Sequence, residues 1–163
     1  MEYLNVGKLV NTHGIKGEVK ILSDFTKKDL VFKKDFNLYL GNEKKKYTIT
    51  SYRHHKMFDM VTFEGYDNIN QVLELKGLSV YINKEDLKIA ANDYILEDLI
   101  GMTVVENEEI LGKVVDLMYN SGNNLLKVLG KSNFYIPVNG DYIKKVDLNK
   151  KIIETQNTKG LIL

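Results

Sequence analysis

The stretch VNTHGIKGEVKI, residues 10–21, holds a threonine–histidine pair and two glycines three residues apart, between two segments in which apolar and polar residues alternate. Such alternation is the period of a β-strand. Glycine adopts positive backbone φ angles at little cost, so Gly14 and Gly17 predict a tight turn between two strands. This turn leaves His13 and Lys16 at an exposed rim, where binding residues are common.

Two other interpretations of the same stretch fare worse. Thr12 and His13 are adjacent, and adjacent side chains on a strand point to opposite faces, so the imidazole cannot readily deprotonate the hydroxyl. The spacing of the two glycines fits the G-x-x-G loop with which KH domains clamp a nucleic-acid backbone, but that loop joins helices, whereas strand patterns flank this one. A Walker loop would need a Gly-Lys-Ser or Gly-Lys-Thr ending, which is absent.

The rest of the chain continues the strand-and-turn rhythm and predicts an all-β fold. Turn residues recur at spacings of about ten, as in sandwiches and barrels. One segment breaks the period: Ile69, Val72 and Leu73 fall at i, i+3 and i+4, and Gly77 can end a helix in the left-handed conformation. We therefore expect one short helix near residues 68–76. The only proline, Pro137, predicts an edge strand or a strand that ends there.

A polar stretch, KEDLKIAAND at residues 84–93, is poor in β-branched residues and is typical of a linker. It predicts two small β-barrels joined by a linker. The expected boundaries are 1–84 for the first barrel, 85–95 for the linker and 96–163 for the second barrel.

Composition excludes several function classes. The 163 residues include no cysteine, which removes disulfides, thiolate metal sites and a cysteine nucleophile. No apolar run approaches the roughly 20 residues that span a bilayer. The start, MEYLNVGKLV, lacks the apolar region of a secretory signal, so a cytoplasmic protein is expected.

Charge is divided unevenly along the chain, although the net charge is only +1. Residues 1–90 carry 15 basic against 12 acidic side chains, and residues 91–163 carry 8 against 10. A polyanionic partner should therefore meet the first half. Arg53 is the only arginine among the 23 basic residues, so lysines must supply most phosphate contacts.

Two further clusters stay open. In YRHHK, residues 52–56, two adjacent histidines diverge on a strand and no third ligand is indicated, so a metal site is not expected. A solvated basic edge and an RNA-contacting strand explain this cluster equally well. The apolar residues of DYIL, residues 93–96, suit either packing between domains or docking of another protein.

Taken together, the motifs resemble those of the ribosome maturation factor RimM family. The opening VGKLVNTHGIKGEVKI is similar to the family's first motif, and RHHKMFDMVTFEGYDNINQVLELKGLSVYI looks like its central block. DLIGMTVVE, LGKVVDLM, FYIPV and VDLNKKII resemble the family's C-terminal PRC-barrel. The resemblance covers nearly the whole chain in order.

The resemblance implies a non-enzymatic protein without metal or cofactor, with a translation-factor-like N-terminal barrel. Such proteins bind the head of the immature 30S subunit, assist the 3′ domain of 16S ribosomal RNA, and contact ribosomal protein S-nineteen. A monomer with no membrane contact is expected. One departure is that the family usually has two consecutive tyrosines where this chain has Tyr94-Ile95. The rival hypotheses are a general RNA-binding or translation-factor-like barrel without an assembly role, and a PRC-barrel scaffold that binds only protein.

These arguments yield two sets of candidate residues. The expected RNA contacts are His13, Lys16, Lys20, Arg53, His54 and Lys56. The expected protein-docking residues are Tyr94, Ile95, Leu96 and Asp98.

Overall fold

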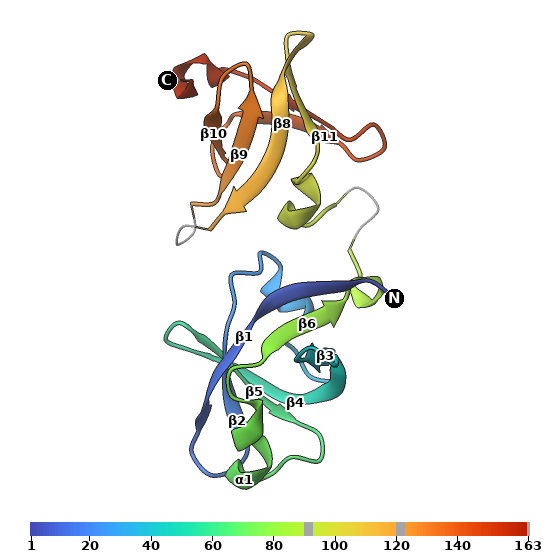
Figure 1. Ribbon diagram of the computed structural model, residues 1–163, viewed down its shortest axis with the longest axis vertical. Coiled ribbons are helices and arrows are strands. Elements are labelled where there is room, and N and C mark those ends of the chain that lie inside the picture. Colours follow the sequence, from blue (N-terminus) through green and yellow to red (C-terminus); the bar gives the residue numbers. More distant parts are fainter. Residues whose placement is uncertain (90–92, 120–122, 163) are drawn as a thin grey trace. The chain divides into compact units, whose positions relative to one another are not determined.

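The structure is a computed structural model that describes residues 1–89, 93–119 and 123–162. The chain divides into two compact units, Met1–Ala91 and Asn92–Leu163 (Figure 1). Each unit is built on one six-stranded sheet, and the all-β prediction is confirmed.

The first unit is a closed barrel with strand order β1-β2-β5-β4-β3-β6. All neighbouring pairs are antiparallel. Closure leaves no unpaired strand edge, and the alternating apolar residues fill the interior. Side chains with no exposed surface, such as Ile21, Ile49 and Val61, form the core. The strands are β1 (Tyr3–His13), β2 (Glu18–Leu22), β3 (Asn37–Leu40), β4 (Lys45–His55), β5 (Phe58–Phe63) and β6 (Ser79–Asn83).

The predicted short helix is present between β5 and β6. It consists of α1 (Ile69–Val72) followed directly by a 3-10 turn, η2 (Leu73–Leu75). At its start, the Gln71 side-chain oxygen accepts the backbone N–H of Asn68 at 3.2 Å, which satisfies a donor that the helix itself leaves unpaired. Gly77 follows the helix with a φ of +91°, the left-handed conformation expected of a helix-ending glycine.

The long connection between β2 and β3, residues 23–36, packs against the barrel instead of looping into solvent. It carries a 3-10 turn, η1 (Lys28–Leu30), and its buried apolar side chains are Phe25, Val31, Phe32 and Phe36. The Phe32 ring stacks on the Tyr52 ring of β4, with centroids 6.2 Å apart. This connection is called the β2–β3 strap below.

The second unit is a sheet in the order β10-β9-β8-β7-β12-β11, in which only β12 and β7 are parallel. Within the described residues, edge strands β10 and β11 are not paired with each other. Pro137 ends β10, as its missing N–H predicts. The strands are β7 (Thr103–Glu106), β8 (Glu109–Met118), β9 (Leu125–Gly130), β10 (Phe134–Pro137), β11 (Ile143–Asp147) and β12 (Ile152–Thr155).

Three 3-10 turns complete the description: η3 (Lys84–Asp86), η4 (Leu96–Leu99) and η5 (Thr158–Leu161). Glu106 at the end of β7 holds η5 in place, because its carboxylate accepts the hydroxyls of Thr158 at 2.7 Å and Thr155 at 3.0 Å. Burial alone raises the pKa of Glu106, but these hydrogen bonds outweigh it and leave the pKa below its ordinary value.

Candidate nucleic-acid interface

The β1–β2 turn has the conformation that its glycines predict. Gly14 and Gly17 have φ angles of +66° and +88°. A Cβ on Gly17 would lie 2.5 Å from the backbone oxygen of Tyr66, so this position also requires close backbone packing. The Ile15 carbonyl accepts the N–H of Ile69, the first residue of α1, at 2.9 Å. The turn is therefore hydrogen-bonded to the start of α1 and packed closely against the chain just before it.

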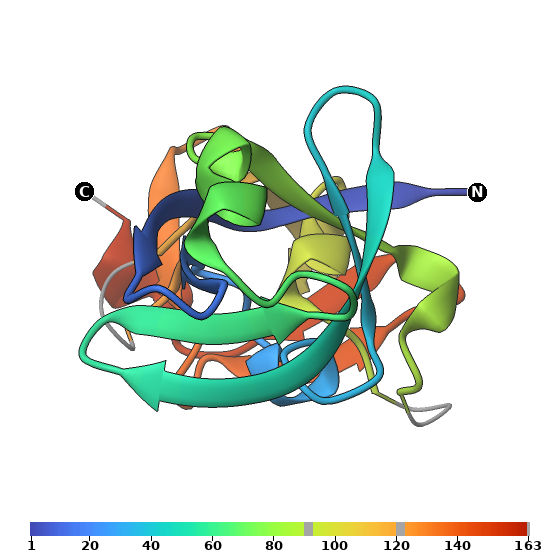
Figure 2. The same cartoon turned by 90° about the horizontal axis from the view of Figure 1, so that it is seen from below.

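Strand register places three of the predicted basic residues, His13, Lys20 and Arg53, on the outer face of the barrel. His13 pairs with Glu18, and Lys20 pairs with Met60, which in turn pairs with Arg53. Because paired residues lie on the same side of a sheet, His13, Lys20 and Arg53 lie in neighbouring rows outside the barrel. Met60, between Lys20 and Arg53, has no exposed surface. Figure 2 shows the β4–β5 hairpin running along one side of the barrel and extending past it.

Arg53 is not a free guanidinium on this face. Its Nε and a terminal nitrogen donate to the two Glu18 carboxylate oxygens, at 2.9 and 2.7 Å. This fork-to-fork pair lowers the pKa of Glu18 through the Arg53 hydrogen bond, and it raises the pKa of Arg53. Arg53 is expected to contact RNA, but in the structure its guanidinium is paired with the Glu18 carboxylate, which it neutralises and orients.

The cations gather around His55, which the sequence analysis did not select as a contact. The His13 and His55 rings lie 6.2 Å apart, and the Lys20 ammonium lies 5.1 Å from the centre of the Phe58 ring. The pKa of His55 is lowered by desolvation and then by the nearby charges of Arg53, Lys56, His13 and Lys20. Strand alternation could have found His55, since it shares a face with Arg53. The cluster of His13, Lys20, Arg53, His55 and Lys56 is called the basic face below.

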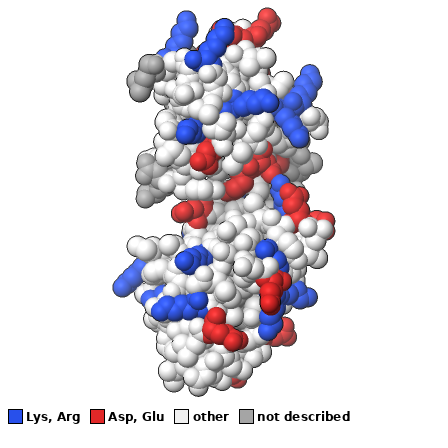
Figure 3. All heavy atoms as spheres, in the orientation of Figure 1, with Lys and Arg blue, Asp and Glu red and all other residues white. Residues whose placement is uncertain are grey.

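Charges elsewhere on the surface are mixed. Figure 3 shows Lys and Arg side chains interspersed with carboxylates on the side it presents, over both units. The side shown therefore carries no single-sign field, and the basic face is defined by the local arrangement of its own residues. Binding of a polyanion there would depend on a few close cations.

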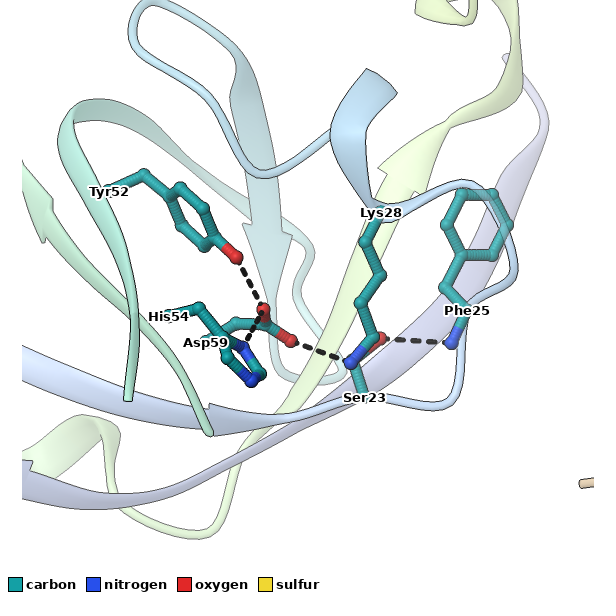
Figure 4. Close-up of polar contacts among 6 residues, drawn as sticks. All are labelled: Ser23, Phe25, Lys28, Tyr52, His54 and Asp59. Carbon is teal, nitrogen blue, oxygen red and sulfur yellow. Dashed lines mark hydrogen bonds and ion pairs between the residues drawn. The ribbon is translucent and has the colours of Figure 1, made fainter. Parts of the chain in front are cut away.

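His54, another expected RNA contact, points to the opposite side of β4. There it lies 3.5 Å from the fully buried carboxylate of Asp59, measured from Nδ1 to Oδ1. Figure 4 shows Tyr52, His54 and Lys28 converging on this carboxylate. The Tyr52 hydroxyl donates to Oδ1 at 2.8 Å, and the Lys28 ammonium is 3.0 Å from Oδ2. His54 is thus separated from Lys20 and Arg53.

The buried carboxylate fastens the β2–β3 strap to the barrel. Lys28 belongs to the strap, whereas Tyr52 and Asp59 belong to β4 and β5. Beyond the Lys28 ion pair, Oδ2 of Asp59 accepts no hydrogen bond from a described residue. Burial, followed by the hydrogen bond and the charge of Asp59, raises the pKa of Tyr52 to about 12. The sequence does carry a signal for this cluster. Asp59, Val61 and Phe63 are at alternate positions of β5 and therefore share its inward face, where a charged residue is unexpected.

Beside the basic face, the β1–β2 turn borders a hollow of about 410 Å³. Ile15 is 73% exposed at its edge. The residues that line the hollow are His13, Gly14, Ile15, Lys16, Glu18 and Thr62.

The expected docking residues of the second unit are less exposed than their sequence context suggests. Ile95 has no exposed surface, and Tyr94 and Leu96 are partly buried and pack against the core of the unit. Asp98 lies in η4, where its N–H donates to the Ile95 carbonyl at 3.0 Å. A docking role for Ile95 would require this side chain to be uncovered first, because burial leaves it no surface to offer.

In residues 1–89, 93–119 and 123–162, no group of three or more His, Asp or Glu side chains is placed to hold a metal ion. Over the same ranges, no helix is both long enough and apolar enough to cross a membrane. Fold and surface together define a class: an all-β protein of two units, whose first barrel carries a basic outer face beside a partly apolar hollow.

Sequence comparison specifies the family within this class. The chain belongs to the RimM family: residues 4–87 match the RimM N-terminal domain, and residues 96–161 match the RimM PRC barrel domain. "Ribosome maturation factor RimM" of Staphylococcus haemolyticus is 37% identical over 164 residues, covering 98% of both chains. That of a Staphylococcus aureus strain is 39% identical over 158 residues, covering 93% of this chain and 95% of the relative.

Solved structures are more distant in sequence. A Pseudomonas aeruginosa protein described as a putative 16S ribosomal RNA processing protein RimM is 22% identical, with a TM-score of 0.48. It covers 95% of this chain and 97% of its own. The N-terminal domain of RimM from Thermus thermophilus is 18% identical with a TM-score of 0.46, covering 55% of this chain and 98% of its own.

Proposed function

We propose that this protein is a ribosome maturation factor that binds the head of the immature 30S subunit and assists folding and processing of the 3′ domain of 16S ribosomal RNA. The first barrel contacts RNA, and the start of the second unit contacts ribosomal protein S-nineteen. The proposal is supported by family membership over both units and by relatives named ribosome maturation factor RimM.

The single observation that carries the RNA contact is the basic face. Cations from β1, β2 and β4 surround His55, whose pKa is lowered first by desolvation and then by their charges. Among them, Arg53 pairs with the carboxylate of Glu18. Clustered lysines and histidines beside aromatic rings are suited to a phosphate backbone. We place the primary RNA contacts at Lys16, Lys20, Lys56 and His13, with His55 added and His54 in a secondary position.

Contact with a ribosomal protein is supported by the chemistry around η4. Glu97 and Asp98 lie in this turn, and Tyr94 and Leu96 keep part of their apolar surface accessible. A half-exposed aromatic residue flanked by carboxylates suits a basic partner, because apolar anchors give affinity and rim charges steer association. Tyr94 carries the anchoring role here, since Ile95 is buried.

The test is sedimentation with purified ribosomal particles. A tagged form of the protein should co-sediment with immature 30S particles and not with mature 70S ribosomes. Equal binding to both particles would favour the general RNA-binding barrel without an assembly role. Binding to isolated ribosomal protein without any dependence on RNA would favour a protein-only scaffold.

A further inference from the structure

The strongest unassigned feature is the hollow at the β1–β2 turn, which combines an apolar edge with a positive rim. Ile15 exposes 73% of its surface although its backbone is held by the Ile69 N–H and by the close packing of Gly17. A side chain on a turn that is already ordered loses little further entropy when it makes a contact. The turn thus presents an apolar surface that can bind a partner with little loss of backbone conformational entropy.

The size and lining of the hollow restrict what can occupy it. Its volume, about 410 Å³, is in the range of sites for small organic groups. The His13 ring and the Ile15 side chain offer apolar surface to a flat group, and Thr62 also lines the hollow. Bases of single-stranded RNA stack on aromatic rings such as that of His13, whereas the major groove of an RNA helix is too deep and narrow for side chains to read.

The charges around the hollow select the partner. His13 and Lys16 lie on its rim, and Lys20 and His55 follow on the adjoining basic face. Glu18 is the one carboxylate among its lining residues, and Arg53 neutralises it. A basic ribosomal protein would be repelled here, whereas a phosphate backbone would be attracted.

We propose that this hollow binds an unpaired nucleotide of RNA, with the base against Ile15 and His13 and its flanking phosphates on Lys16 and Lys20. The inference rests on the proposed function, because it specifies how the first barrel contacts ribosomal RNA. It adds that the barrel recognises a single-stranded position and not a duplex.

The test compares two exposed isoleucines with the same substitution. Ile15→Ser removes the apolar edge of the hollow without changing charge, and Ile110→Ser makes the same change on β8, where Ile110 is 66% exposed. Binding to a fluorescently labelled single-stranded RNA octamer is measured by anisotropy, with a hairpin duplex as competitor. Melting temperatures of both variants check that the fold is retained.

Ile15→Ser should weaken binding of the octamer by about tenfold, because the base loses the apolar side chain that it packs against. Ile110→Ser should bind like the wild type, and the duplex should compete poorly. Unchanged octamer binding by Ile15→Ser, or equal competition by the duplex, would overturn the proposal. So would loss of binding to a ribosomal protein with octamer binding intact, because the hollow would then be a protein site.

Sedimentation separates this result from a failure of the proposed function. If Ile15→Ser binds the octamer normally while the wild type still co-sediments with immature 30S particles, the nucleotide site is wrong and the maturation role stands. If the octamer binds in an Ile15-dependent way but immature particles are not bound, the site stands and the maturation role is wrong.

Discussion

Two isoleucines outside the strands, Ile15 and Ile95, differ completely in exposed surface. Ile15, in the β1–β2 turn, is 73% exposed, whereas Ile95, before η4, has no exposed surface. The sequence pattern favours a docking role for Ile95 and indicates none for Ile15. The difference teaches that exposure follows local packing. The backbone of the β1–β2 turn is hydrogen-bonded to α1 and leaves Ile15 facing outward, whereas Tyr94 and Leu96, on either side of Ile95, pack against the core of the second unit.

The largest expected effect is on stability at Ile95. Ile95→Ala should lower the free energy of unfolding by about 2 to 5 kcal/mol, because it leaves a cavity at a fully buried position. Ile15→Ala is the matched control and should change it by less than about 0.5 kcal/mol, as an exposed site does. Urea unfolding of both variants measures the difference. Equal small effects would mean that Ile95 is accessible in solution, which would restore it as a docking residue.

A smaller effect is expected at the buried carboxylate of Asp59. Lys28→Met should destabilise the protein by about 2 kcal/mol, since it removes the cation from a buried anion, although partial exposure of Lys28 moderates the loss. Lys33→Met, at an exposed lysine of the same strap, is the control and should be nearly neutral. Chemical unfolding compares them. If both variants are equally stable, the β2–β3 strap is held by its buried aromatic residues alone.

The smallest effect is the pH dependence of the Arg53–Glu18 pair. The pKa of Glu18 lies below its ordinary value of 4.5, so the pair contributes stability above that value and loses it as the pH falls through the lower folded-state pKa. Arg53 is 49% exposed, and solvent screening limits the contribution to less than about 1 kcal/mol. In urea unfolding below pH 4.5, the free energy of unfolding should fall less steeply with decreasing pH in Glu18→Gln than in the wild type. Glu64→Gln should behave like the wild type. The same pH dependence in the wild type and in Glu18→Gln would show that the pair is not formed in solution.

Much of the fold was predictable from local patterns. The glycines of the β1–β2 turn, the i, i+3, i+4 pattern of the short helix and the strand-ending Pro137 each depend on the physics of a few neighbouring residues. The expected boundaries at 84 and 96 remain a prediction about independent folding, which limited proteolysis between the units would test.

The site was predictable only in part, because its contacts cross the barrel. Arg53 and Glu18 are 35 positions apart, and they meet because the strand order is β1-β2-β5-β4. Periodicity could have separated His54 from Arg53 and His55, since neighbours on a strand point to opposite faces. Alternation along β5 predicts that Asp59 faces inward, because it is at the same period as the apolar Val61 and Phe63. Its partner Lys28 could not be predicted in this way, since the β2–β3 strap has no strand pattern.

The most direct measurement is the salt dependence of binding to immature 30S particles. Lys20→Gln combined with Lys56→Gln removes two cations of the basic face, and Lys33→Gln combined with Lys34→Gln removes two from the strap. The first double variant should bind more weakly, and the slope of log affinity against log salt should flatten by somewhat under one unit per lost phosphate contact. The second should match the wild type. Equal slopes for all three proteins would contradict RNA binding by the basic face.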